Sequence, residues 1–341
     1  MAVTIKDVAA LAGVSPSTVS RVCNDHPSIS FETRERVRQA MTDLGYEPGV
    51  PAVQNPPSLR LVGVILPPAP REIYEHSFYL EAIRGISQFC CHNQVGCTIL
   101  TGKDDEELLQ AVQSLSQSGQ LTSFIFLYSK QEDPIVDYLC EQGMLYSVIG
   151  KATQLPNQTC SVDNDNLLAG REVTDYLYDL GHRRIAYLGC ESMFVFSAER
   201  KSGYQLSLLQ HGLPIRSEFC LDIEHLSEDG LTAMEQLLTL RDRPSAIVTV
   251  DDTMAVTLER VCTRLGLTIP GDVSIVSFNN STFAKLSTPP LTSVEVNSFQ
   301  LGYEATSQLV IHADNPNLPA TKSVVPHRLV QRNSCREWTE A

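Results

Sequence analysis

The first 24 residues leave room for one simple arrangement, two short helices around a tight turn. In the first helix the apolar side chains recur at helical spacing: Ile5, Val8, Ala9 and Ala12. Gly13 is placed to end that helix, and Ser15 is a good N-cap for a second one. Pro16 then takes the first helical position, where a missing N–H has no partner to lose. We predict two helices that bury their inner faces against a common core.

The outer face of the second predicted helix carries small hydroxyl side chains and one base: Ser17, Thr18, Ser20 and Arg21. Slim side chains let a helix approach phosphates in the DNA major groove, and a guanidinium can bind guanine O6 and N7 together. A capped helical hairpin with no DNA partner is the alternative. A third helix favours the first interpretation, because Ser30 can cap it and an apolar stripe follows at Val37, Ala40, Met41 and Leu44. Three helices around one core form a helix-turn-helix module.

Charge is distributed unevenly along the 341 residues. The net charge is −14, yet residues 1–60 contain as many basic as acidic side chains. The negative excess therefore lies downstream of the predicted helices. We expect modest, salt-dependent non-specific DNA affinity, with specificity resting on a few placed contacts and on formation of a homodimer.

Other classes of protein find little support in the sequence. No apolar run approaches the roughly 18 residues of a membrane helix, and the chain starts directly in a capped helix, so we expect a cytoplasmic protein. The ten cysteines lack metal-ligand spacing and are expected to be free thiols, with no metal or cofactor. We find no esterase elbow, zinc-protease motif, phosphate loop or dinucleotide fingerprint, and expect no enzyme. His182 is expected to end a helix as a charged group.

Residues 48–60 differ from their surroundings. The segment contains four prolines and lacks a helical period, so it is interpreted as a linker between a domain at 1–47 and a larger one at 61–341. Pro51 could start a helix, but Pro56 and Pro57 would stop it within about a turn and a half.

From Leu61 onward, apolar runs of strand length alternate with helical stretches. The runs lie at 61–66, 123–128, 146–149, 184–189, 246–250 and 273–278, and examples of the helices lie at 80–90, 105–116, 167–180 and 253–265. Continuous apolar strands separated by helices are typical of parallel sheets covered on both faces. Ligands of such folds bind at the carboxyl ends of the strands.

Several polar side chains fall at those strand ends, and aromatic residues accompany them. The candidate ligand-binding residues are Phe78, Tyr79, Tyr128, Lys151, Asp163, Arg200, Asp251 and Asn279. Carboxylates, amides and a guanidinium beside flat apolar rings suit a polyhydroxylated sugar. Helix capping is an equal alternative for Asp163, Asp252 and Asn280, and a structural ion pair for Lys151.

The run from Val3 to Pro48, VTIKDVAALAGVSPSTVSRVCNDHPSISFETRERVRQAMTDLGYEP, resembles the N-terminal module of the LacI/GalR family of bacterial repressors. The resemblance implies base contacts from Pro16, Ser17 and Arg21. It implies phosphate contacts from a second set: Ile5, Ser15, Thr18, Asn24, Ser30 and Thr33. In this family the linker usually holds a short hinge helix that wedges a leucine into the minor groove. This sequence departs from that pattern, because no leucine lies between Tyr46 and Leu59, so we do not expect such a wedge, and whether a hinge helix forms stays open.

The resemblance continues through almost the whole chain and implies an all-α helix-turn-helix domain followed by an α/β, two-lobed domain like a type I periplasmic binding protein. One lobe is expected at about 61–160 with 292–324, the other at about 163–290 with 325–341. An arginine in the family's Arg-x-x-Gly-aromatic segment, here Arg200, generally contacts the effector.

Segments around Val162–Asn166, Ile149–Lys151 and Ser277–Asn297 are most similar to the maltose-operon repressor subgroup, which implies a repressor released by maltose or a maltodextrin. Two alternatives stay open. One is a regulator that needs a corepressor, and the other is a solute-binding receptor for sugar transport. Dimer and tetramer also stay open.

Overall fold

The computed structural model describes residues 5–23, 29–44, 60–68, 77–119, 121–190, 194–224 and 227–339, with the side chains of Ser17, Ser20 and Arg60 left out. The chain divides into two units, Met1–Leu59 and Arg60–Ala341, and each is treated by itself. The linker expected at 48–60, and with it the question of a hinge helix, lies almost entirely outside the described residues. No described helix is long and apolar enough to cross a membrane.

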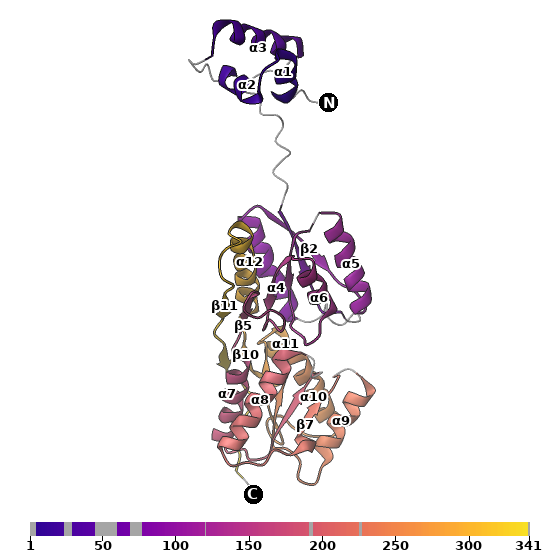
Figure 1. Ribbon diagram of the computed structural model, residues 1–341. Coiled ribbons are helices and arrows are strands. Elements are labelled where there is room, and N and C mark those ends of the chain that lie inside the picture. Colours follow the sequence, from indigo (N-terminus) through magenta and orange to yellow (C-terminus); the bar gives the residue numbers. More distant parts are fainter. Residues whose placement is uncertain are drawn as a thin grey trace. The chain divides into compact units, whose positions relative to one another are not determined.

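The described residues of the first unit form three helices around one small core (Figure 1). They are α1 (Ile5–Ala12), α2 (Pro16–Cys23) and α3 (Phe31–Leu44). Gly13 adopts a left-handed φ of 64° between α1 and α2, a conformation that glycine enters at little energetic cost. The core is formed by the inner faces of all three helices: Val8, Ala9, Ala12, Val19, Val22, Val37, Ala40 and Met41. The predicted apolar stripes are therefore buried as expected.

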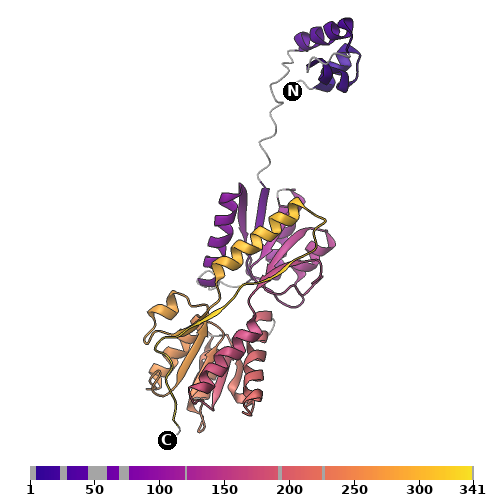
Figure 2. The same ribbon diagram turned by 90° about the vertical axis from the view of Figure 1, so that its left-hand side faces the viewer.

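The first lobe of the second unit is a six-stranded parallel sheet in the order β11-β5-β4-β3-β1-β2. Its strands are β1 (Arg60–Ile65), β2 (Val95–Leu100), β3 (Ser123–Phe126), β4 (Leu145–Ile149), β5 (Cys160–Asp163) and β11 (Lys322–Val324). Its helices are α4 (Ser77–His92), α5 (Asp105–Gln117), α6 (Pro134–Glu141) and α12 (Ser298–Asp314). α4 and α12 pack together over one face, and Figure 2 shows α12 in gold running across it. α5 and α6 cover the other face.

The second lobe repeats this plan with the order β12-β10-β9-β8-β6-β7, parallel except for β12 at one edge. Its strands are β6 (Ile185–Gly189), β7 (Cys220–Asp222), β8 (Ala246–Thr249), β9 (Ser274–Phe278), β10 (Thr292–Glu295) and β12 (Arg328–Val330). Its helices are α7 (Asn166–Asp179), α8 (Val195–Gln210), α9 (Glu228–Thr239), α10 (Asp252–Arg264) and α11 (Thr282–Leu286), with a 3-10 turn at Ser217–Phe219. Two layers of helix around each sheet bury separate cores.

The chain passes between the lobes three times, after β5, after β10 and after β11. The expected lobe boundary at residue 292 was wrong. Strand β10 pairs with β9, Thr292 opposite Val276, so it belongs to the second sheet and the first lobe resumes only with α12. Strand β5 pairs with β4 and ends the first passage of the first lobe at Asp163, close to the boundary expected between 160 and 163.

His182 also differs from its prediction. Its ring is completely buried and is hydrogen-bonded on both nitrogens, to Ser245 Oγ at 2.9 Å and Ser274 Oγ at 3.1 Å. Burial lowers the pKa of His182 to about 4, so the ring is neutral. Arg183 takes the expected place at the helix end, where it donates to the Tyr178 and His182 carbonyls.

Candidate functional site

Helix α2 begins with a hydroxyl cap of the kind that the sequence predicts. The Thr18 N–H lies 3.2 Å from Ser15 Oγ, and the two hydroxyl oxygens are 2.9 Å apart. Helix α3 repeats the arrangement, with Thr33 N–H 3.3 Å from Ser30 Oγ and the hydroxyls 2.9 Å apart. Two helix N-termini thus end in exposed hydroxyls and backbone N–H groups, which is the chemistry that binds phosphate oxygens.

The remaining residues of the expected DNA surface are placed in part. Pro16 and Arg21 are exposed, and Arg21 has no hydrogen-bond or ion-pair partner within the described residues. Ile5 is half-buried against the helical core. The backbones of Ser17 and Ser20 lie in α2, while Asn24 is outside the described residues. Among the described residues nothing binds the Arg21 guanidinium, so it can contact a DNA base from the exposed side of α2.

The second unit contains a cavity of about 600 Å³, including its part open to solvent, where the strand ends of both sheets meet. Seven of the eight predicted ligand-binding residues line it: Phe78, Tyr79, Tyr128, Asp163, Arg200, Asp251 and Asn279. Asp163 ends β5 and Asn279 directly follows β9, while Tyr128 and Asp251 lie two residues after β3 and β8. These strands belong to two different sheets. The strand-end rule therefore located the cavity from the sequence.

Arg200 is the one basic side chain among the described residues that line the cavity, and it is only 5% exposed. Its Nε donates to Asn166 Oδ1 at 2.9 Å and its Nη1 to the Val250 carbonyl at 2.7 Å, and its guanidinium lies 4.2 Å from the centre of the Phe278 ring. Nη2 makes no hydrogen bond to a described residue. A guanidinium fixed in this way presents one edge to a ligand and has little freedom to turn.

Asp163, at the end of β5, faces the same cavity. Its Oδ1 accepts from the Asn164 N–H at 2.8 Å and from Asn166 Nδ2 at 3.0 Å. Burial raises the pKa of Asp163 to about 7; Glu199 adds to that rise, while the Asn164 N–H, Lys151 and Arg200 oppose it. The helix cap that was an alternative for Asp163 is made instead by Asp165, whose Oδ1 accepts from Leu168 N–H.

Asp251 and Asn279 come from the second sheet. Asp251 caps α10, its Oδ1 accepting from Met254 N–H at 2.8 Å, and it also lines the cavity. Asn279 has a left-handed φ of 93° and its side chain makes no hydrogen bond to a described residue. Asp252 and Asn280 lie outside the cavity and tie the lobe internally, to Ser277 and Ser293 and to Glu295 and Arg332 respectively.

Aromatic rings form the apolar walls. Phe78 and Tyr79 on α4 meet edge to face with centroids 5.4 Å apart. Tyr128 is almost completely buried, and Phe196 on α8 contributes a fourth ring. Flat apolar surfaces beside paired donors and acceptors match the C–H faces and hydroxyls of a sugar.

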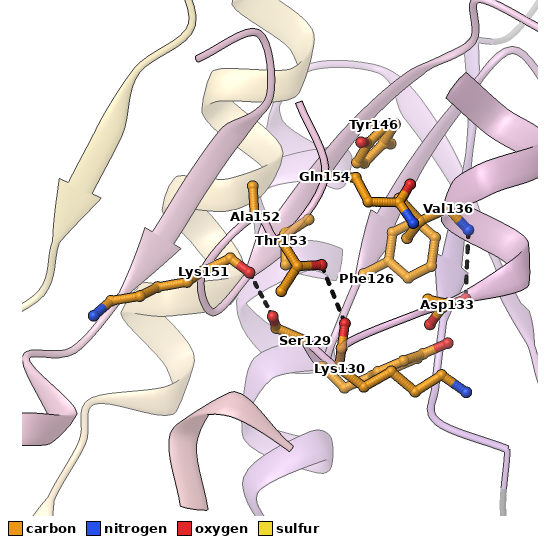
Figure 3. A pocket seen from close by; sticks show the side chains of 12 residues that line it. Phe126, Ser129, Lys130, Asp133, Val136, Tyr146, Lys151, Ala152, Thr153 and Gln154 are labelled. Carbon is orange, nitrogen blue, oxygen red and sulfur yellow. Dashed lines mark hydrogen bonds between the residues drawn. The ribbon is translucent and has the colours of Figure 1, made fainter. Parts of the chain in front are cut away.

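Lys151 does not line this cavity. It forms an ion pair with Glu199 of the second lobe, the structural alternative that the sequence left open. Lys151 instead borders a smaller cavity of about 250 Å³, which shares Tyr128 and Ser129 with the larger one (Figure 3). Figure 3 shows two hydrogen bonds within it, with Ser129 Oγ donating to the Lys151 carbonyl and Thr153 Oγ1 to that of Lys130. The sequence predicted none of its lining residues as ligand-binding except Tyr128 and Lys151.

The sequence reasoning missed the other described residues that line the larger cavity: Leu127, Ser129, Ile149, Gly150, Asn164, Asn166, Phe196 and Leu301. Four of them, Leu127, Ile149, Gly150 and Asn164, end or immediately follow a strand, so the strand-end rule could have found them. Asn166, Phe196 and Leu301 could not be found in this way, because they lie on α7, α8 and α12 and reach the cavity only through helix packing.

Comparison with known proteins gives consistent results over the whole chain. Residues 4–49 match the profile described as bacterial regulatory proteins, lacI family, and residues 174–335 match a periplasmic binding protein-like domain. The HTH-type transcriptional regulator MalR of Streptococcus pneumoniae is 33% identical over 337 residues, 97% of this chain and 100% of that protein. A putative transcriptional regulator LacI from Bacillus cereus subsp. cytotoxis is 34% identical, with a TM-score of 0.79 over 82% of this chain and 100% of its own. The transcriptional regulator CelR-cellobiose complex is 28% identical, with a TM-score of 0.75 over 98% of this chain and 100% of its own.

Proposed function

Because this chain belongs to the lacI family of bacterial regulatory proteins, we propose that it represses sugar-utilisation genes and leaves its operator when maltose or a maltodextrin binds the cavity of the second unit. The observation that supports this proposal most directly is the cavity itself, which is lined by seven of the eight residues predicted from the sequence, drawn from both lobes. The helix-turn-helix unit on the same chain is the DNA-binding part whose operator affinity the bound sugar would change.

The charges in the cavity favour an uncharged sugar. Among its described lining residues one base, Arg200, stands against two carboxylates, Asp163 and Asp251. A sugar phosphate or uronate would bring a further negative charge into a largely buried site, and burying an unpaired charge is expensive. A neutral sugar instead offers hydroxyls to both kinds of group.

Maltose is proposed on the similarity to MalR, and a disaccharide is consistent with the relative solved with cellobiose. Hydroxyl groups would bind Arg200, Asp163 and Asn279, while the sugar's C–H faces lie against Phe78, Tyr79 and Phe196. Lys151 is left out of this proposal because its ammonium group is paired with Glu199.

We propose that the protein binds DNA as a homodimer, each α2 reading one half of a near-palindromic operator. Arg21, Pro16 and Ser17 would contact bases. Contacts to the phosphate backbone are proposed for a second group: Ile5, Ser15, Thr18, Ser20, Asn24, Ser30 and Thr33. We further propose that the protein works in the cytoplasm and has no catalytic activity of its own.

Release requires the sugar to bind the DNA-incompetent state more tightly than the competent one. The cavity is suited to this because its groups come from both lobes, and other contacts cross between the lobes beside it. The Ser129 carbonyl accepts from the Val195 N–H at 3.1 Å, and Lys151 pairs with Glu199. A sugar that bridges the lobes favours one separation of them over others.

The test uses the full chain and an operator selected from random duplexes with the purified protein. Thermal unfolding is followed with glucose, maltose, maltotriose, cellobiose and glucose 6-phosphate, and operator affinity is then measured with each. Maltose should stabilise the protein and weaken operator binding. Stronger operator binding with a sugar would favour a corepressor mechanism, and no stabilisation by any neutral sugar would reject the proposal.

A further inference from the structure

Two charged side chains of the cavity, Arg200 and Asp163, are joined by the amide of Asn166. Asn166 is 2% exposed at the start of α7. Its Oδ1 accepts from Arg200 Nε at 2.9 Å, and its Nδ2 donates to Asp163 Oδ1 at 3.0 Å. One side chain therefore satisfies a base on one side and an acid on the other.

This bridge decides which atoms are left for a ligand. The Asn166 amide binds Arg200 Nε and Asp163 Oδ1, and the Val250 carbonyl accepts a hydrogen bond from Arg200 Nη1. The atoms with no bond to a described residue are Arg200 Nη2 and Asp163 Oδ2. One is a donor and the other an acceptor, and both are held at a fixed spacing.

We propose that Asn166 is a positioning residue that keeps Arg200 and Asp163 apart as a donor and acceptor pair, so that the site recognises two neighbouring hydroxyls of an uncharged sugar. The proposal rests on the proposed function of the cavity. Without the amide, the guanidinium and the carboxylate would be free to bond to each other, as opposite charges in a buried site do. Both would then be lost to the ligand together.

The order of the bridge also explains why an amide suits this position. A carboxylate in its place could accept from Arg200 but could not donate to Asp163, and an apolar residue could do neither. The amide of Asn166 has an acceptor at one end for the base and a donor at the other end for the acid.

The chain provides a matched control. Asn280 is also buried and also bridges a base and an acid: its Oδ1 accepts from Arg332 and its Nδ2 donates to Glu295. It lies in the same lobe as Arg200 but does not line the cavity. Asn166→Ala and Asn280→Ala therefore remove equivalent bridges, one in the site and one outside it.

The experiment measures maltose affinity by calorimetry for the wild type, Asn166→Ala, Asp163→Ala, the double variant and Asn280→Ala. We expect about tenfold weaker binding in each of the first two variants. The double variant should be little weaker than either single one, because both act through the same pair of atoms. Asn280→Ala should bind maltose as the wild type does. A near hundredfold loss in the double variant, or an equal loss in Asn280→Ala, would overturn the proposal.

A ligand-free measurement keeps the two proposals separable. The Nε–H resonance of Arg200, assigned by its absence in Arg200→Lys, should exchange slowly with water in the wild type, in Asn280→Ala and in Asp163→Ala, where Asn166 still accepts from it. It should exchange rapidly in the double variant, which lacks both the amide and the carboxylate. Slow exchange in the double variant would refute the bridge whether or not any sugar binds. Absence of maltose binding in the wild type, with the exchange pattern as expected, would reject the proposed sugar and retain the bridge.

Discussion

Acidification should weaken sugar binding through a single carboxyl group. Burial raises the pKa of Asp163 to about 7. Roughly nine-tenths of these groups are then ionised at pH 8 and roughly one-tenth at pH 6. The ionised form accepts a hydrogen bond from a sugar hydroxyl with either oxygen, whereas the protonated form carries a hydrogen on one of them. If maltose requires the ionised form, its affinity should fall about tenfold between these pH values, or about 1.4 kcal/mol.

Calorimetric titration of maltose at pH 8, 7 and 6 measures this fall. Several charged groups influence Asp163, namely Glu199, Lys151 and Arg200, so the assignment depends on a control. Asp163→Asn keeps the size of the side chain and cannot titrate. It should bind more weakly at pH 8 and equally at all three values. A wild-type affinity that does not change with pH, or a tenfold fall that persists in Asp163→Asn, would refute the reasoning.

Four further changes have defined outcomes. Arg21→Ala should weaken operator binding by about 1 to 3 kcal/mol and relax preference at one base pair, and a gel-shift titration equal to the wild type would show that α2 is not the reading helix. Arg200→Ala should retain operator binding but lose the response to maltose, a super-repressed phenotype that a reporter strain detects. Gly170→Ala would place a Cβ 2.2 Å from the Arg200 carbonyl, so α7 and α8 must separate, and urea denaturation should show a loss of about 1 to 3 kcal/mol. Because His182 is buried as the neutral ring with a pKa of about 4, the free energy of unfolding should fall by about 3 kcal/mol in all as the pH drops from 6.5 towards 4. His182→Gln should lack this dependence in urea titrations at pH 7.5 and 5.

Local sequence patterns predicted the elements and the cavity well, because both follow from short-range rules. Apolar periodicity identified the three N-terminal helices, and parallel strands expose their following residues at one edge, which is why Asp163, Asp251 and Asn279 were found. The lobe boundary at residue 292 failed because strand pairing is a long-range property. Nothing in Thr292–Glu295 itself says that it pairs with β9 rather than with the first sheet.

Side-chain partners were less accessible to sequence reasoning for the same reason. Lys151 follows a strand, yet a glutamate 48 positions later in the chain neutralises it. His182 has charged neighbours in the sequence, but in the structure its two ring nitrogens are hydrogen-bonded to Ser245 and Ser274, which lie far along the chain. The bridge through Asn166 depends on the packing of α7 against α8 and left no local signal.

The three passages between the lobes are joined by one side chain. Asn164, in the first passage, donates from Nδ2 to the Val296 carbonyl in the second at 3.1 Å and to the Val325 carbonyl in the third at 2.8 Å. Segments clamped at a common point turn about it together and cannot slide past one another, so the lobes have a pivot in place of a sliding joint. Arg60 is at the amino end of β1, whereas Asn164 follows the carboxyl end of the parallel strand β5, and six residues of strand span roughly 20 Å. At that distance from the pivot, each degree of turn moves Arg60 through roughly a third of an ångström. A tilt that a ligand sets next to Asn164 therefore moves the start of the unit farther than it moves the atoms beside the pivot.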